Sequence, residues 1–102
     1  MSSHSIPDSL RRLAPELAEI SEQLLFGNIW QRPGLSARDR SLITVATLAA
    51  MGRLPQLRWH IGFAQQNGVT RDELSELFTH LAFYAGWPAA ASGLDCMEGE
   101  PD

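Results

Sequence analysis

Two histidines and one arginine are the residues of this 102-residue chain best suited to acid–base or anion-binding chemistry. His60 lies in LRWHIGFAQQNGVT, His80 lies in ELFTHLAFYAGWPAA, and Arg40 opens the nearly apolar stretch RSLITVATLAAM. Imidazole and guanidinium groups on apolar helices cost free energy unless they are paired or used in function. These three residues are therefore the first candidates for a site.

His60 falls beside Leu57, Ile61 and Ala64 on the apolar side of a predicted helix. Two interpretations are open. His60 is either a core histidine bonded to a backbone carbonyl, or a general acid or base whose pKa is tuned by burial. The residue pattern alone favours the structural role.

His80 borders the apolar stripe of the next predicted helix, with Glu76 four residues before it and Tyr84 four residues after it. Residues at this spacing share one helix face. One interpretation is a surface Glu–His pair beside a half-buried tyrosine. The other is a catalytic imidazole that is oriented by the carboxylate, with the phenol as a hydrogen-bond donor.

Arg40 lies in the first turns of a predicted helix, where the helix dipole disfavours a cation. We therefore expect Arg40 to pair with an acidic side chain or to bind an anionic ligand. Arg32 lies close to Trp30 in the preceding loop and is a second anion-binding candidate, or else an exposed loop arginine.

The composition excludes several classes of function. The net charge of −4 argues against nucleic-acid binding, and the absence of lysine excludes Schiff-base catalysis. A single cysteine, Cys96, excludes an intrachain disulfide and a multi-cysteine metal site, and we interpret it as a structural thiol. A site of two histidines and Glu76 is too unspecific a pattern to predict a metal.

The sequence also lacks a secretory signal pattern and an apolar run of membrane-spanning length. Together with the single cysteine, these features lead us to expect a cytoplasmic protein that does not associate with membranes.

The apolar periodicity predicts an all-α protein, a compact bundle of about five to six helices in a single domain over residues 1–102. Pro15 either kinks the first helix or starts it anew. Ser36 and Thr70 are predicted N-caps, and Glu73 completes a capping box with Thr70. The predicted helices span residues 9–26, 37–51, 55–67, 71–85 and 88–97, and residues 98–102 form a frayed tail.

Packing considerations add two expectations. The second predicted helix leaves little polar face, so we expect it to be buried on all sides. Trp30, Trp59 and Trp87 are too bulky to be hidden together in so small a core. We therefore expect a homo-oligomer that buries some of them between subunits.

Three stretches, GNIWQRPGLSARDRSLITVATLAAMGR, LRWHIGFAQQNGVTRDEL and FTHLAFYAGWPAAASGL, together resemble the carboxymuconolactone decarboxylase family. The resemblance covers a core of about residues 26–94. It implies an all-α, alkylhydroperoxidase D-like fold and assembly as a homotrimer or homohexamer.

The alkylhydroperoxidase D-like branch of this family uses a CxxCxxxH motif and a glutamate on the preceding helix. Counted back from His60, the two thiol positions hold Arg53 and Gln56, and the glutamate position holds Ser41. Reduction of peroxides by disulfide exchange needs both thiols. A peroxidase is therefore an alternative that follows the family name but not these residues.

The gamma-carboxymuconolactone decarboxylase branch is similar at residues 32–35, 40–44, 57–70 and 80–90. This resemblance implies a carboxy-lyase that acts without cofactor or metal on a small unsaturated lactone or carboxylic acid in aromatic-compound catabolism. It implies His60, His80, Arg40 and Tyr84 as catalytic residues, and we expect Arg32, Trp30 and Trp87 to bind substrate.

Two departures from this branch lie within residues 63–87. FAQQNG stands where AALNNG is more usual, and Trp87 replaces a smaller residue before Pro88. A non-catalytic helical subunit of a larger oligomer is the remaining alternative.

Overall fold

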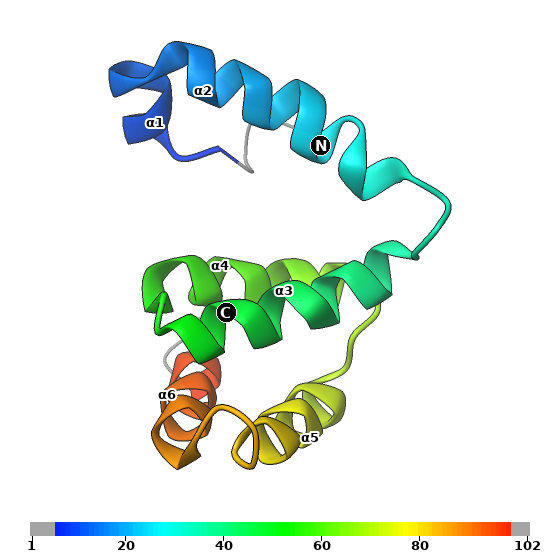
Figure 1. The fold of residues 1–102 in the computed structure, drawn as a ribbon, viewed down its shortest axis with the longest axis vertical. Coiled ribbons are helices and arrows are strands. Elements are labelled where there is room, and N and C mark those ends of the chain that lie inside the picture. Colours follow the sequence, from blue (N-terminus) through cyan, green and yellow to red (C-terminus); the bar gives the residue numbers. More distant parts are fainter. Residues whose placement is uncertain (1–5, 99–102) are drawn as a thin grey trace. The chain divides into compact units, whose positions relative to one another are not determined.

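The computed structural model describes residues 6–98, and within this range the chain forms helices and turns without a β-strand (Figure 1). The predicted all-α class is therefore confirmed. The chain divides after Ala37 into two compact units. We describe each unit by itself. No helix within residues 6–98 combines the length and apolar character needed to cross a membrane.

The N-terminal unit begins with two short helices in place of one long helix. Helix α1 spans Asp8–Leu13 and helix α2 spans Pro15–Ile20. Between them Ala14 leaves the helical conformation, with φ −143° and ψ 69°. Proline suits the first position of a helix because its missing N–H would have no intrahelical partner there. Of the two predicted outcomes at Pro15, the structure therefore shows a new start.

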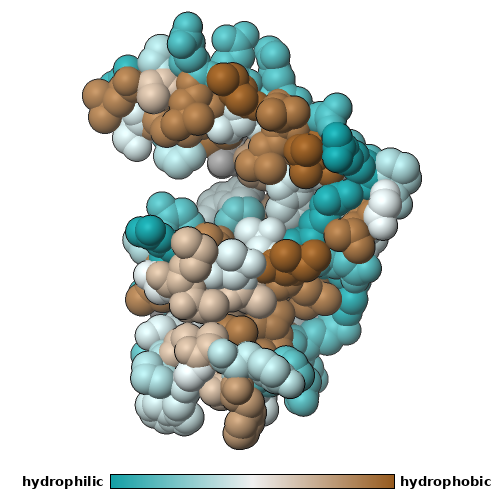
Figure 2. Space-filling view, in the orientation of Figure 1, coloured by the Kyte–Doolittle hydropathy of each residue, from teal (hydrophilic) through white to brown (hydrophobic). Residues whose placement is uncertain are grey.

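The π-helix η2 (Ser21–Phe26) continues directly from α2, and the 3-10 helix η3 (Ile29–Gln31) lies in the predicted loop. Ala18 and Trp30 are buried in this unit. Four apolar positions of the predicted first helix are instead between 51% and 79% exposed: Leu13, Leu17, Ile20 and Leu24. Figure 2 shows apolar side chains gathered on the surface of this unit.

The C-terminal unit contains four longer helices. They are α3 (Ala37–Met51), α4 (Leu54–Gln66), α5 (Arg71–Leu81) and α6 (Trp87–Glu98). Gly52 and Gly68 have φ angles of +73° and +100°, a conformation in which a side chain is strained, and they follow α3 and α4 as predicted. Helix α5 ends four residues earlier than predicted because residues 82–85 form turns.

The capping box at the start of α5 is present as predicted. The Glu73 N–H donates to Thr70 Oγ1, and the Thr70 N–H donates to Glu73 Oε1, each at 3.0 Å. These two bonds satisfy backbone donors that an uncapped helix would leave to water. The position and direction of α5 are therefore fixed at its first turn.

Helix α6 packs against both α4 and α5. The core contains Leu57 and Ile61 of α4, Leu74 and Phe78 of α5, and Cys96 of α6. Cys96 is only 1% exposed, in agreement with a structural thiol. Trp59 and Trp87 are partly exposed, as expected for a core too small to bury all three tryptophans.

The expectation that the second predicted helix is buried on all sides is wrong for the single chain. Only Ser41, Val45 and Ala49 of α3 are buried, at spacings that form one stripe. Ile43 and Met51 are more than half exposed. The helix meets the core along one face, and Asn67 Nδ2 donates to the buried Ser41 hydroxyl at 2.9 Å.

The contact between α6 and α5 predicts opposite effects for two glycine substitutions. A Cβ atom at Gly93 would lie 2.6 Å from Cδ1 of the buried Phe78 ring, whereas a Cβ at Gly62 of α4 would meet no atom within 4 Å. Gly93→Ala should lower the free energy of unfolding by about 1–3 kcal/mol through overpacking. Gly62→Ala should raise it by about 0.5–1 kcal/mol because alanine favours helix.

Urea denaturation of the two variants and the wild type measures both effects. Equal stability of the two variants would show that α6 does not approach Phe78 this closely.

Candidate active site

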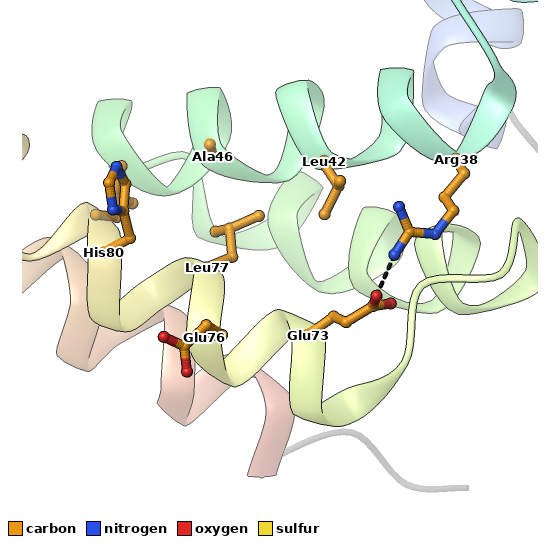
Figure 3. A pocket seen from close by; sticks show the side chains of 8 residues that line it. Arg38, Leu42, Ala46, Glu73, Glu76, Leu77 and His80 are labelled. Carbon is orange, nitrogen blue, oxygen red and sulfur yellow. Dashed lines mark hydrogen bonds and ion pairs between the residues drawn. The ribbon is translucent and has the colours of Figure 1, made fainter.

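A pocket of about 440 Å³ lies between α3 and α5 of the C-terminal unit (Figure 3). Ligand-binding pockets of small molecules commonly have volumes of this order. In the α3–α5 pocket, apolar side chains form the floor and charged side chains lie at the ends and the rim. The lining residues are Arg38, Leu42, Ala46, Glu73, Glu76, Leu77, His80 and Leu81.

Helical spacing explains why these side chains meet. Residues 38, 42 and 46 recur every four residues along one face of α3, and residues 73, 76, 77, 80 and 81 form the matching face of α5. Leu74 and Phe78, also on α5, point into the core instead. One helix thus supplies both a buried stripe and a pocket wall.

An ion pair between Arg38 and Glu73 closes one end of the pocket (Figure 3). Arg38 Nη2 donates to Glu73 Oε2, while Glu73 Oε1 accepts the Thr70 backbone N–H. The hydrogen bond from Thr70 and the neighbouring Arg38 guanidinium both lower the pKa of Glu73. The carboxylate therefore stays ionised at neutral pH.

His80 lies at the other end of the pocket. Its imidazole stacks on the Tyr84 ring with 5.0 Å between centroids and 28° between planes. Tyr84 is 81% exposed and not half-buried as one interpretation expected. Within residues 6–98 no hydrogen bond or ion pair joins His80 to Glu76, so the predicted orientation of the imidazole by this carboxylate is not observed.

His60 lies on α4, is partly buried, and does not line this pocket. Its imidazole is flanked edge-on by the rings of Trp59 and Phe63, with centroids 4.8 and 6.0 Å away. Burial lowers the pKa of His60 from 6.5 to about 4, because the charged form loses hydration. His60 is therefore neutral near pH 7.

Arg40 is partly buried on α3, where its carbonyl accepts the Thr44 hydroxyl at 2.8 Å. It does not line the α3–α5 pocket, and neither does Trp87, which is 74% exposed at the start of α6. The structure thus brings only His80 of the four predicted catalytic residues to this pocket, with Tyr84 stacked beside it.

Arg32 and Trp30 belong to the N-terminal unit. Arg32 Nε donates to Asn28 Oδ1 at 3.3 Å, and the buried Trp30 ring stacks on Phe26 with 6.1 Å between centroids. The α3–α5 pocket is built entirely from the other unit.

Sequence reasoning missed two members of the pocket. Arg38 was not singled out, and Glu73 was recognised only as a capping residue. The available signal was the spacing of Arg38, Leu42 and Ala46, which places a cation on the same face as two apolar residues. Within residues 6–98, no three His, Cys, Asp or Glu side chains gather as a metal site would require.

The sequence profile of the carboxymuconolactone decarboxylase family matches residues 15–99. The chain belongs to this family. The match includes the pocket-forming helices α3 and α5 and begins at the first residue of α2, upstream of the core at residues 26–94 that carried the resemblance. The predicted family is therefore confirmed.

Curated relatives support the same assignment. The chain is 38% identical over 91 residues to the 4-carboxymuconolactone decarboxylase of Acinetobacter baylyi, which covers 89% of the chain and 68% of that relative. It is 31% identical over 97 residues to nitrosuccinic acid decarboxylase npaB of Metarhizium robertsii, covering 92% and 68%. An uncharacterized 15.0 kDa protein of Paracoccus denitrificans is 29% identical over 92 residues, covering 88% and 69%.

The lowered pKa of His60 predicts a pH-dependent loss of stability. The unfolded chain binds a proton near pH 6.5 and the folded chain only near pH 4, so stability falls as the pH drops through this range. His60→Gln lacks this titration. Between pH 7 and pH 4, the wild type should lose about 1–2 kcal/mol more than this variant, allowing for solvent screening at a partly buried side chain.

Urea denaturation of both proteins across the range measures the difference, and the other titrating groups cancel in the comparison. Parallel stability curves would show that His60 is hydrated in the folded protein.

Proposed function

We propose that this chain is a carboxy-lyase that decarboxylates gamma-carboxymuconolactone or a similar small unsaturated lactone or carboxylic acid, without a cofactor. The observation that carries the proposal is the pocket between α3 and α5, with an apolar floor and His80 at one end, in a member of this family. The relatives support the reaction class, because two of them are named as decarboxylases of different acids.

The proposed reaction needs no external electron sink. The bond between the gamma carbon and its carboxylate breaks, carbon dioxide leaves, and the electron pair moves through the ring double bond to the lactone carbonyl oxygen. Protonation at carbon then restores the carbonyl. The protein must therefore orient the substrate, stabilise the developing oxyanion and deliver one proton.

His80 is our candidate for the proton donor. It lines the pocket, whereas His60 does not. The low pKa of His60 also leaves it neutral near pH 7, where it cannot act as an imidazolium acid. The sequence left these two roles open, and the structure supports this division. We assign Tyr84, which stacks on His80, to hydrogen bonding with the oxyanion.

The apolar floor has a role in the same reaction. Leu42, Leu77 and Leu81 line the pocket between its charged ends. Loss of carbon dioxide converts a charged carboxylate into a neutral molecule, so low polarity around the departing group favours the products. Arg40, His60, Arg32, Trp30 and Trp87 remain predicted site residues that this pocket does not contain.

Thiol chemistry has less support. Arg53 and Gln56 occupy the two thiol positions of the peroxidase branch, and Cys96 is buried in the core. A thiol must be accessible as a thiolate to attack a peroxide. We also propose a cytoplasmic location, on the basis of the single cysteine and the expected small-molecule substrate.

We further propose that the chain assembles as a homotrimer or homohexamer. Phe83, Tyr84 and Trp87 at the turn between α5 and α6 are 84%, 81% and 74% exposed. Large aromatic side chains exposed on a surface are typical of a protein–protein interface. Burial between subunits would remove this apolar area from water.

Replacement of His80 tests the proposed reaction. His80→Ala should reduce turnover of gamma-carboxymuconolactone by about 100- to 10,000-fold, the usual contribution of a general acid. The substrate is generated in situ, and its loss is followed by ultraviolet absorbance. Because His80 is exposed, the variant should keep the wild-type fold.

Two outcomes would contradict the proposal. Full turnover by His80→Ala would remove His80 from the mechanism. Absence of turnover by the folded wild-type protein, on this and related unsaturated lactones, would favour the non-catalytic alternative.

A charge at Phe83 tests the proposed assembly. Phe83→Glu should shift the wild-type oligomer toward smaller species in sedimentation velocity, because a buried carboxylate opposes association. Gln56→Glu, which adds the same charge at an exposed position of α4, is the matched control and should sediment as the wild type does. A monomeric wild-type protein would refute the assembly itself.

A further inference from the structure

We propose that Arg38 is the carboxylate-binding residue of the α3–α5 pocket, so that a ligand places an anionic group at the Arg38 end and its apolar body toward His80. This inference deepens the proposed function, because it rests on that function for the claim that the ligand is a substrate. The binding claim itself can be tested without turnover.

Arg38 has hydrogen-bonding capacity beyond its contacts in the chain. Its Nη2 donates to Glu73, and Nη1 lies 3.9 Å from Asp39 Oδ1. A guanidinium carries five N–H donors in a planar fork that matches the geometry of a carboxylate. The side chain is 39% exposed and borders the pocket, so the other donors are accessible to a ligand.

Glu73 holds the guanidinium in place before a ligand arrives. One carboxylate oxygen accepts the Thr70 backbone N–H, and the other accepts Arg38 Nη2. The anchor of Arg38 is thus itself fixed to the first turn of α5. A long side chain that is already held in position loses less conformational entropy when it binds.

The charges at the two ends define a direction. Glu73 and His80 are seven residues apart on α5, which corresponds to about 10 Å along the helix axis. Figure 3 shows Leu77 between them on the same wall and Leu42 opposite on α3. Glu73 is paired with Arg38, whereas Glu76 in the His80 half has no ion pair within the described residues and would repel a second carboxylate there. The anchored carboxylate therefore belongs at Arg38, which leaves the departing carboxylate beside the apolar residues Leu42 and Leu77.

Helix geometry separates Arg38 from Arg40. Two residues along an α-helix turn the side-chain direction by about 200°, so the two arginines of α3 lie on nearly opposite faces. Only Arg38 lines the α3–α5 pocket. Arg38 is thus the cation of α3 that a ligand in this pocket meets.

The first test is a titration of the ¹⁵N-labelled full chain with hexanoate and, separately, with hexylammonium. Both have one charged group and an unbranched alkyl chain, of five carbons in hexanoate and six in hexylammonium, so they differ mainly in the sign of the charge. Hexanoate should bind with a dissociation constant about tenfold lower and shift the amide signals of Leu42 and Leu77. Arg38→Gln should weaken hexanoate binding by about tenfold or more, the effect of losing a charge-assisted bidentate contact.

Two further variants make the result specific. Arg38→Lys keeps the charge but lacks the planar fork, so its affinity for hexanoate should lie between those of the wild type and Arg38→Gln. Arg71→Gln removes an exposed arginine from the first position of α5. Arg71 does not line the pocket, so this variant should bind hexanoate as the wild type does.

Tighter binding of hexylammonium would overturn the proposal, because it would mean that Glu76 selects cations. Unchanged hexanoate binding by a folded Arg38→Gln variant would also overturn it.

A turnover assay distinguishes failure of the Arg38 inference from failure of the proposed lyase function. Arg38-dependent hexanoate binding by a wild-type protein without turnover would support the inference and refute the lyase. Turnover with an unchanged KM in Arg38→Gln would do the reverse.

Discussion

The carboxylate of Glu73 joins the first turn of α5 to the first turn of α3. One oxygen accepts the Thr70 N–H and so completes the cap of α5, while the other accepts Arg38 from α3. Several other side chains could cap the helix. The Glu73 carboxylate, however, also sets the distance between α3 and α5 at one end of the pocket. The bonds that begin the helix and the ion pair that shapes the pocket therefore depend on the same two oxygens. The rest of the pocket follows from helical spacing once these two starting points are fixed.

Much of the fold could be predicted because its determinants are local. The capping box at Thr70 and the turn at Gly52 each depend on residues close together in the sequence, whereas at Pro15 the sequence left both a kink and a new helix open. How much of each helix is buried was harder to predict from the sequence. An apolar run such as α3 predicts a buried helix, yet Ile43 is exposed, because one chain of this length covers only one face of the helix.

The candidate site was harder to predict because it depends on contacts between distant residues. Arg38 and Glu73 are 35 positions apart, and no short motif signals that they meet. The two histidines illustrate the same difficulty. Each lies near an apolar stripe in the sequence, but burial leaves His60 neutral, whereas His80 lines the α3–α5 pocket. Whether an imidazole is buried or accessible depends on its neighbours in space.

The close approach of Gly93 to the Phe78 ring has a consequence for redesign of substrate range. The backbone of α6 lies directly behind α5, so α5 has no room to retreat and its wall of the pocket is effectively rigid. Changes of pocket volume are therefore best sought on the opposite wall, at Leu42 and Ala46 of α3. A library that varies these two positions would explore larger and smaller ligands while the charged ends keep their separation. The same library placed on α5 would also change Glu73 and Glu76 and the candidate proton donor His80.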